Sequence, residues 1–394
     1  DVVPGVTAGI AARAYAGIPV NHREESASVT FLTGHEDPEK SQSRIDLEQA
    51  AASPATLVFY MGLKSLAANA RTLIEAGRPV DQPVAVIEKG TTPAQRVVEG
   101  TLETIAGAVE AAGLRPPALV VVGQVAAKRQ QLAWFEKRPL FGVSVVITRA
   151  RDRISTLAGR IRNLGGEVVE LPVSQTELMD QDDPGVSQAL DTFAGGEFGL
   201  VCFTSPAGVT SFFGLLEGRG LDARAFSGTE IAAIGPSTAR SLAEHGLNAD
   251  YLPEKFVAEG MLKTLEKVPM EGRQVLIARA EEGRELLPET LRQRGASVTV
   301  MPVYRTVPDT PSEAAWKRAA AADFVTFTSA SSVHNLVRTE TIDPAAFAPR
   351  VVTIGPVTSE AAREAGFTVA IEAERHDLDG LVEAIIRGRV SVSE

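Results

Sequence analysis

Two short stretches of the chain repeat one pattern of residues whose groups can bind an anion. IGPSTARSLAEHG (residues 234–246) and IGPVTSEAAREAG (354–366) each read as a strand end, a Gly-Pro turn and a helix start, with a threonine at the same place, Thr238 and Thr358. The first turn of a helix offers N–H groups without intrahelical partners, and these groups bind anions. The pattern therefore indicates a site for carboxylates or other negative groups.

A second pair of turns has the same chemistry. FTSPAG (203–208) and FTSAS (327–331) each follow a short apolar run and precede a helical pattern. In the first of them Ser205 can cap the helix and Pro206 suits its first position. Hydroxyls at these turns can donate to a bound carboxylate. The residues concerned are Thr204, Ser205, Thr328 and Ser329.

Two arginines at equivalent strand ends, Arg149 and Arg279, suit the same ligand, because guanidinium groups bind carboxylates. Each feature also has a simpler interpretation. Serine and threonine at helix starts are ordinary caps, a duplicated gene duplicates its caps, and arginines at strand ends can be solvated surface charges. The spacing alone leaves both interpretations open.

These turns belong to an internal repeat in the second part of the chain. Residues 145–173 match 274–303, and residues 200–216 match 324–337, so that the segments follow in the order A, B, A, B. The repeat predicts two similar α/β domains built from a unit of roughly 120 to 130 residues, a normal domain size. Because the carboxyl ends of parallel strands share one edge, we expect each domain's turns to lie together and the two domains to face each other across a cleft.

The first part of the chain predicts a further α/β domain. TLVFYMG (56–62), PVAVIEKG (83–90) and ALVVVG (118–123) are short apolar runs separated by helical patterns. LAWFEKRPLFG (132–142) is charged, contains proline and breaks both periodicities. We therefore place the boundary between the two parts there.

The composition excludes several classes of protein. The chain has 394 residues, of which 44% are hydrophobic, and a net charge of −11. It is long enough for two or three domains, and it contains no run of about 18 apolar residues. The first residues have neither the basic start nor the apolar core of a signal peptide, so a cytoplasmic protein is expected. The acidic balance argues against a nucleic-acid-binding surface.

Histidine and cysteine indicate neither a metal site nor a nucleophile. The five histidines are scattered without metal-ligand spacing, and no metal is predicted. The single cysteine, Cys202, lies in the apolar run GLVCFTS (199–205), which predicts a thiol buried in the core.

The first part resembles the C-terminal part of uroporphyrinogen-III C-methyltransferases, which transfer methyl groups to uroporphyrinogen III. The resemblance rests on VVPGVTAG, AYAGIPVNHR, LVFYMG, GTTPAQRVVEGTL and PALVVVG, in family order across residues 1 to about 130. It implies S-adenosyl-L-methionine as cofactor and a homodimer formed through this part. It also implies that the cofactor contacts Thr7, Ala8, Met61 and Gly90.

The sequence opens on Asp1, and the family's glycine-rich GAGPGDP loop is not found in it. We therefore treat the sequence as truncated at its N-terminus. Since that loop forms the other wall of the family's cofactor site, we expect the methyltransferase part to be inactive as it stands.

Residues from about 142 to 394 resemble uroporphyrinogen-III synthases, on the paired FTS and IGP turns and on VYRTVP (303–308). The repeat by itself leaves tandem and interleaved domains open. The resemblance implies interleaving, with two crossing strands near Val173 and Arg305 that join the domains. The implied division is 1–135 for the methyltransferase part, 136–142 for a linker, 143–173 with 306–394 for the first synthase domain, and 174–305 for the second.

The resemblance implies a substrate, hydroxymethylbilane, whose ring the enzyme closes with inversion of the last pyrrole and without a cofactor. Its product, uroporphyrinogen III, is the substrate of the methyltransferase, which makes precorrin-2. Loss of the substrate's hydroxyl needs a proton donor, and Tyr304 matches the family's tyrosine; the alternative is that Tyr304 only packs at the hinge. The substrate's carboxylates are expected at Thr204, Ser205, Thr238, Thr328, Ser329, Thr358, Arg149 and Arg279.

A contrasting hypothesis is a two-lobed module that binds a tetrapyrrole as a sensor, without turnover. A stand-alone methyltransferase with a structural tail does not fit, because about 250 residues are far more than a tail. The sequence does not distinguish a route toward sirohaem from one toward cobalamin.

Overall fold

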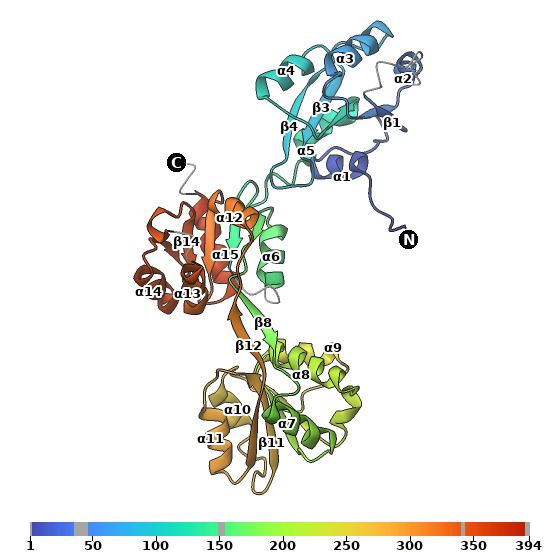
Figure 1. Ribbon diagram of the computed structural model, residues 1–394. Coiled ribbons are helices and arrows are strands. Elements are labelled where there is room, and N and C mark those ends of the chain that lie inside the picture. Colours follow the sequence, from blue (N-terminus) through green and yellow to red (C-terminus); the bar gives the residue numbers. More distant parts are fainter. Residues whose placement is uncertain (1, 35–45, 149–153, 340–342, 391–394) are drawn as a thin grey trace. The chain divides into compact units, whose positions relative to one another are not determined.

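The computed structural model describes residues 2–34, 46–148, 154–339 and 343–390 (Figure 1). The chain divides into two compact units. Unit 1 contains residues 1–148, 155–171 and 312–394, and unit 2 contains residues 149–154 and 172–311. Unit 1 includes two sheets and unit 2 includes one.

The first sheet of unit 1 is mixed, with the strand order β1-β2-β5-β3-β4. β1 (Val29–Thr33) lies parallel to β2 (Thr56–Tyr60). β5 (Ala118–Val122) pairs antiparallel with both β2 and β3 (Pro83–Glu88), and β4 (Arg96–Thr101) is antiparallel to β3. The helices of this part are α1 (Ala8–Tyr15), α2 (Leu47–Ala52), α3 (Leu66–Glu75), α4 (Ile105–Ala112), η1 (Gln124–Lys128) and α5 (Arg129–Leu132).

Strands that are apolar at successive positions give this sheet two buried faces. In β2, Leu57 and Phe59 pack in one core cluster with residues of α3 and α4, whereas Val58 belongs to a second cluster with residues of α1. Successive side chains of a strand point to opposite faces, so a strand that is apolar at every position must be covered on both. The continuous apolar runs of the sequence thus predict the burial of this sheet correctly.

The second sheet of unit 1 is entirely parallel, with the order β15-β14-β13-β6-β7. Its strands are β6 (Ser144–Ile147), β7 (Glu167–Glu170), β13 (Phe324–Phe327), β14 (Arg350–Thr353) and β15 (Val369–Glu372). The helices of this part are α6 (Ile154–Asn163), α12 (Glu313–Ala320), α13 (Ala330–Arg338), α14 (Pro356–Glu364), α15 (Leu378–Val390) and the short η4 (Pro344–Ala346).

The sheet of unit 2 has the order β10-β9-β11-β12-β8. β9 (Leu200–Phe203), β10 (Glu230–Ala233), β11 (Gln274–Ala280) and β12 (Ser297–Pro308) are parallel, and β8 (Ser174–Leu178) joins β12 antiparallel. The helices of this unit are α7 (Pro184–Ala194), α8 (Pro206–Gly218), η3 (Ala223–Phe226), α9 (Pro236–Glu244), α10 (Ala258–Thr264) and α11 (Leu286–Gln293).

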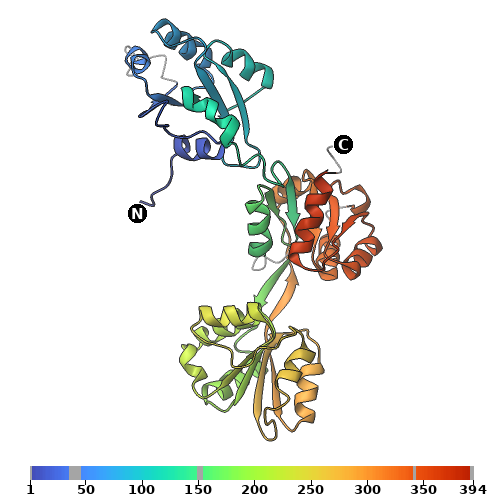
Figure 2. The same cartoon turned by 180° about the vertical axis from the view of Figure 1, so that it is seen from behind.

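Helices cover both faces of the sheet of unit 2 (Figures 1 and 2). Residues of α7, α8 and α9 share one core cluster with Val201 and Phe203 of β9. Residues of α10 and α11 share another with Leu200 and Cys202 of the same strand. The unit is therefore a three-layer α/β/α sandwich whose central strands are buried on both sides.

The strand pairing interleaves the two copies of the repeat. β6, from the first A segment, pairs with β13, from the second B segment, and β9, from the first B segment, pairs with β11, from the second A segment. The two parallel sheets consequently have matching orders, β14-β13-β6-β7 and β10-β9-β11-β12. The predicted fold class, a methylase part followed by two similar α/β domains, is confirmed.

The structure also shows that the repeat is longer than the sequence analysis recognised. EKFVAEG (254–260) and ERHDLDG (374–380) follow the IGP turns of the two copies and lead into α10 and α15. A Cβ atom at Gly260 would lie 2.0 Å from the carbonyl oxygen of Lys255, and one at Gly380 would lie 2.1 Å from that of Arg375. Both copies thus need glycine at this place, because the backbone turns back on itself there.

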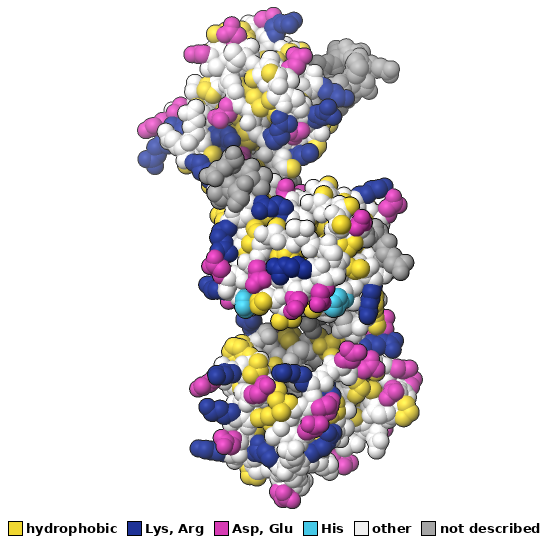
Figure 3. Space-filling model, turned by 90° about the vertical axis from the view of Figure 1, so that its left-hand side faces the viewer, with side chains coloured by type: hydrophobic (Ala, Val, Ile, Leu, Met, Phe, Trp, Pro, Cys, Tyr) yellow, Lys and Arg dark blue, Asp and Glu magenta, His cyan; other side chains and the backbone are white. Residues whose placement is uncertain are grey.

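Charged side chains of both signs cover the face shown in Figure 3, where dark blue Lys and Arg lie among magenta Asp and Glu. The acidic excess is therefore not gathered on one part of that face.

No helix in the described part of the chain is long and apolar enough to cross a membrane. The described residues also hold no group of three or more His, Cys, Asp or Glu side chains placed to bind a metal ion.

Cys202 lies in the core as the sequence predicts, with 1% of its surface exposed. Burial raises the pKa of its thiol to about 12. At pH 8 only ~0.01% of this thiol is ionised, and the thiolate is the reactive form.

We therefore expect the Cys202 thiol of the folded chain not to react with a disulfide reagent at pH 8. After unfolding in guanidinium, one thiol per chain should react, as measured by the absorbance of the released reagent. Rapid labelling of the folded chain would contradict this burial.

Candidate functional site

A cavity of about 900 Å³ opens on the first sheet of unit 1. Three of the four residues predicted to contact a cofactor line it: Ala8, Met61 and Gly90. They come from the start of α1, the turn after β2 and the turn after β3. Since these segments are far apart in sequence, the fold has brought the predicted residues together.

The fourth predicted residue, Thr7, precedes α1 and reaches the cavity through Tyr60. The hydroxyl of Thr7 forms a hydrogen bond with the Tyr60 hydroxyl, which also accepts the N–H of Gly9 at 3.0 Å. Tyr60 lines the cavity. The sequence analysis quoted Tyr60 in YMG without assigning it a role, and its position beside Met61 was the available signal.

Strained backbone surrounds this cavity. Among the described residues other than glycine, positive φ occurs at Met61 (54°), Lys89 (48°) and Thr91 (72°). Met61 and Lys89 line the cavity, and Thr91 lies between the lining residues Gly90 and Thr92. Residues held in this region cost of order 1 to 3 kcal/mol each and cluster where ligands bind. Two lysines of the lining, Lys64 and Lys89, suit a ligand that carries a negative group.

The carboxyl edge of the sheet of unit 2 gathers several other predicted residues. Ser205 caps α8 by accepting the N–H of Gly208 at 3.0 Å, as the sequence predicts, and Thr204 precedes it, half-buried. The Ser205 Oγ lies 3.2 Å from the hydroxyl oxygen of Tyr304. The candidate proton donor and one candidate binding residue are therefore direct neighbours.

An irregularity in β12 aims Tyr304 at this edge. β12 pairs with β11 so that Arg279 lies opposite Pro302 and Ala280 lies opposite Tyr304, which leaves Val303 as an extra residue. Both Val303 and Tyr304 consequently belong to the same core cluster, although neighbours in a regular strand face opposite sides. Tyr304 is 4% exposed.

Thr238 lies in the first turn of α9 and is 1% exposed. Gly235, the N-cap residue of this helix, provides no side-chain cap. The N–H groups of Thr238 and Ala239 already donate to the carbonyl oxygen of Gly235, each at 3.0 Å. Among the described residues the Thr238 hydroxyl has no hydrogen-bond partner, so it can still donate to a ligand that accepts hydrogen bonds.

The structure describes one of the two predicted arginines. Arg279, at the end of β11, is buried, so it is not a solvated surface charge. Its Nη1 donates to the carbonyl oxygen of Arg284 at 2.7 Å, and its Nη2 pairs with Glu285. Arg279 is thus already neutralised by a carboxylate of its own unit. Arg149 lies outside the described residues.

The second sheet of unit 1 repeats these turns. Ser329 caps α13 by accepting the N–H of Ser332 at 3.2 Å, and Thr328 precedes it. Thr358 is buried in the first turn of α14, whose N-cap, Gly355, again provides no side chain. The three predicted hydroxyl residues of each copy are thus held at equivalent helix starts.

Two residues that the sequence analysis missed lie against the IGP turns. A Cβ atom at Gly235 would be 3.3 Å from the Cβ of Phe256, and one at Gly355 would be 3.0 Å from the Cδ2 of His376. Phe256 is 56% exposed, and His376 is also exposed. The repeat of EKFVAEG as ERHDLDG was the signal that could have found them.

Comparison with known families separates the chain into two parts. Residues 155–383 match the family model of uroporphyrinogen-III synthase HemD. Residues 1–106 match that of the tetrapyrrole (corrin/porphyrin) methylases. Both resemblances seen in the sequence are therefore confirmed, and the sensor hypothesis finds no support.

Individual relatives agree with this division. A porphyrin biosynthesis protein HemD of Ruminiclostridium josui is 32% identical over 389 residues, which cover 98% of this chain and 76% of the relative. An S-adenosyl-L-methionine-dependent uroporphyrinogen III methyltransferase of Methanosarcina barkeri is 52% identical over 125 residues, or 32% of this chain and 49% of the relative. The chain thus spans about half the length of that methyltransferase.

Solved structures of both kinds are similar to parts of the chain. Uroporphyrinogen III synthase of Thermus thermophilus is 23% identical with a TM-score of 0.42, and covers 63% of this chain and 99% of its own. Uroporphyrin-III C-methyltransferase of the same organism, complexed with S-adenosyl homocysteine, is 35% identical with a TM-score of 0.27, and covers 32% of this chain and 50% of its own. On the family match over residues 155–383 and the similarity to the HemD relative along nearly the whole chain, the protein belongs to the uroporphyrinogen-III synthase HemD family and carries a tetrapyrrole methylase segment before it.

Proposed function

We propose that residues 143–394 close hydroxymethylbilane to uroporphyrinogen III with inversion of the last pyrrole ring. The observation that supports this most directly, beside the family, is the contact between the hydroxyls of Tyr304 and Ser205 at the carboxyl edge of a parallel sheet. Ligands of open α/β sheets bind at this edge, where the strand order reverses. In unit 2 the reversal lies between β9 and β11, which carry Ser205 and Arg279 at their ends.

In this proposal Tyr304 protonates the leaving hydroxyl. The C–O bond of the hydroxymethyl group breaks, its electron pair takes the phenol proton, and the group departs as water. Ser205 supports this step, because its oxygen already accepts the Gly208 N–H and its own proton is free to be donated to the phenolate oxygen that results. The attack of the substituted pyrrole carbon then closes the ring.

The peripheral carboxylates of the substrate are assigned to the helix starts. Thr238 and Thr358 are both buried in first turns that lack a side-chain cap. Their own N–H groups already donate to Gly235 and Gly355, so the carboxylates are assigned to their hydroxyls. A carboxylate bound there replaces water without leaving a donor unpaired. Thr204, Thr328 and Ser329 complete the set, whereas the ion pair of Arg279 with Glu285 favours a structural role for that arginine.

We further propose that residues 1–135 bind S-adenosyl-L-methionine in the cavity lined by Ala8, Met61 and Gly90, with Thr7 held at its side. In the methyltransferases that this part resembles, the cofactor supplies a methyl group for uroporphyrinogen III; for residues 1–135, which are expected to be inactive alone, we propose binding of the cofactor. The lysines of the lining attract its carboxylate, and the tight turns bring backbone N–H and C=O groups close to the ligand. The synthase reaction itself is proposed to need no cofactor.

Three further assignments rest on the family resemblance and the composition. The chain is proposed to divide into residues 1–135, a linker at 136–142, a domain of 143–173 with 306–394, and a domain of 174–305. The strand pairing of β6 with β13 and of β9 with β11 supports the interleaved part of this division. A homodimer formed through the first part and a cytoplasmic location complete the proposal.

The chain given freshly prepared hydroxymethylbilane should yield mainly the type III isomer, determined by chromatography of the oxidised product. Tyr304→Phe should lower kcat by roughly 10- to 100-fold, because general acid catalysis contributes factors of this order or larger. The product should remain type III, since positioning of the chain and not proton transfer selects the isomer.

Tyr251→Phe is the matched control in the same unit. The Tyr251 hydroxyl donates to Glu230 at 3.0 Å, and Glu230 begins β10, at the opposite end of the strand from Gly235. This variant should keep the wild-type rate. Only type I isomer from the unaltered chain, as in a reaction without enzyme, would refute the synthase proposal; equal rates for both variants would remove Tyr304 from the mechanism.

Gly90→Ala should weaken the binding of S-adenosylhomocysteine, a stable product analogue, by at least about tenfold. A Cβ atom at Gly90 would lie 2.5 Å from the Cβ of Ala12, so that α1 or the turn must move, and both line the cavity. Overpacking of this kind typically costs 1 to 3 kcal/mol. The measurement is isothermal titration calorimetry.

Gly107→Ala serves as the control, because a Cβ atom at this position in α4 meets no atom within 4 Å. It should leave the affinity unchanged and stabilise the helix by about 0.5 to 1 kcal/mol. If Gly90→Ala bound S-adenosylhomocysteine as tightly as Gly107→Ala, the cofactor site would lie elsewhere.

A further inference from the structure

The turn after β3 is the most strained part of the proposed cofactor cavity. Lys89 and Thr91 have positive φ, and Thr91 is β-branched, for which this conformation is a true outlier. Gly90, between them, packs against Ala12 with no room for a side chain. Such a turn keeps its shape only if contacts elsewhere hold it.

One side chain holds the N–H group of Thr91. The Oε1 of Gln95 accepts this N–H at 2.9 Å, and Gln95 is buried. A glutamine amide can present either its oxygen or its NH₂ group, and the reversed orientation would set two donors against each other. Something must therefore fix which way the amide of Gln95 points.

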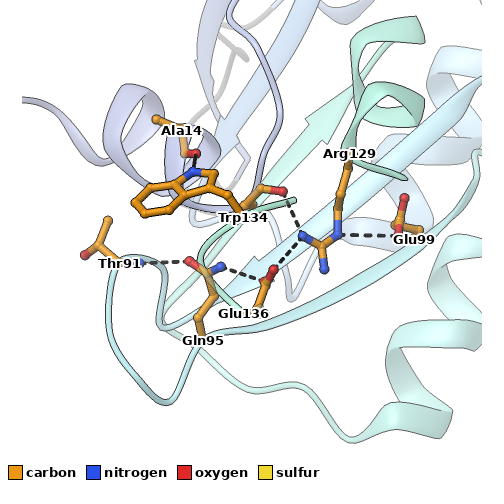
Figure 4. A network of polar contacts seen from close by, with 8 residues as sticks. Ala14, Thr91, Gln95, Glu99, Arg129, Trp134 and Glu136 are labelled. Atoms are coloured by element: carbon orange, nitrogen blue, oxygen red, sulfur yellow. Dashed lines mark hydrogen bonds and ion pairs between the residues drawn. The ribbon is translucent and has the colours of Figure 1, made fainter. Parts of the chain in front are cut away.

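Glu136 fixes it. The Nε2 of Gln95 donates to the Oε1 of Glu136 at 2.7 Å, and an ionised carboxylate can only accept. The NH₂ group is thereby drawn to Glu136, and the amide oxygen is left facing Thr91. Figure 4 shows this chain of contacts from Thr91 through Gln95 to Glu136.

Glu136 is itself held in place. Its Oε2 lies 3.1 Å from the Nη1 of Arg129, which also donates to the carbonyl oxygen of Ala16 at 2.7 Å. The Nε of Arg129 lies 3.4 Å from the Oε2 of Glu99, an ion pair without a hydrogen bond (Figure 4). The carboxylate that orients Gln95 therefore has a fixed position.

We propose that Glu136 is a positioning residue of the methyltransferase part, which sets the geometry of the cofactor turn through Gln95. The inference rests on the proposed binding of S-adenosyl-L-methionine in this cavity. Glu136 begins the proposed linker to the synthase, and its neighbour Trp134 donates its indole N–H to the carbonyl oxygen of Ala14 at 2.9 Å. The segment that leaves the methyltransferase part thus also holds the turn that receives its cofactor.

The test compares three variants of the full chain. Glu136→Leu removes the acceptor, and we expect S-adenosylhomocysteine to bind about tenfold more weakly, since a buried group loses its partner. Glu136→Gln should restore most of the affinity, to within about threefold of wild type, because a neutral amide can still accept but in only one of its two orientations. Glu99→Leu is the control. It also removes one ion pair of Arg129, but it leaves the hydrogen bond between Gln95 and Glu136 in place, so the affinity should change by less than about twofold.

Hydrogen exchange at Thr91 provides a readout that needs no ligand. Its amide should exchange roughly tenfold faster in Glu136→Leu than in Glu99→Leu, with unfolding midpoints of both variants measured alongside. Equal exchange in the two variants would overturn the inference. If the wild-type chain did not bind S-adenosylhomocysteine, the proposed cofactor site would fail, and the exchange comparison would still decide the role of Glu136. Gln95→Leu, which leaves the pair of Glu136 with Arg129 in place, should reproduce the faster exchange if Glu136→Leu does not fold.

Discussion

The synthase half of the candidate site depends on the shift in register where β11 pairs with β12. If β12 alternated regularly through Val303, Tyr304 would turn to the face covered by α10 and α11, away from Ser205. Because the register shifts there, Val303 and Tyr304 both lie on the side of the sheet that carries Ser205. Bulges re-aim side chains at a small cost in ladder hydrogen bonds, and here the shift occurs at the carboxyl edge where ligands of such sheets bind.

Local patterns predicted the serine caps of α8 and α13 well, because capping is a short-range interaction. Ser205 and Ser329 accept the N–H of the residue three positions later, which the sequence alone indicates. The surroundings of Tyr304 and Arg279 were not predictable in the same way. The contact of Tyr304 with Ser205 spans 99 residues and needs the irregular pairing, and the carboxylate that neutralises Arg279 comes from a turn with no recognisable motif.

The methyltransferase part shows a different limit. Its motifs located Ala8, Met61 and Gly90 because the turns themselves line the cavity. They could not show what holds those turns in shape. The positive φ of Lys89 and Thr91 is unfavourable and needs contacts that hold the turn. These contacts come from Gln95 before β4, Arg129 at the start of α5 and Glu136 beyond α5. Polar residues that act on a site through another residue leave no periodic signal in a sequence.

The duplicated turns show which features a fold holds fixed and which it leaves free to vary. Gly235 and Gly355 are approached so closely by the following segment that a side chain would meet it at 3.3 and 3.0 Å, and Gly260 and Gly380 are closer still to backbone. Gly260 and Gly380 are the same in both copies because the backbone that approaches them leaves no room for a Cβ atom, whereas Gly235 and Gly355 are approached by side chains. Phe256 and His376, which make the approach, differ because their exposed side chains carry little of the packing. The two carboxyl edges therefore share one backbone pattern but present a phenyl ring in one copy and an imidazole in the other.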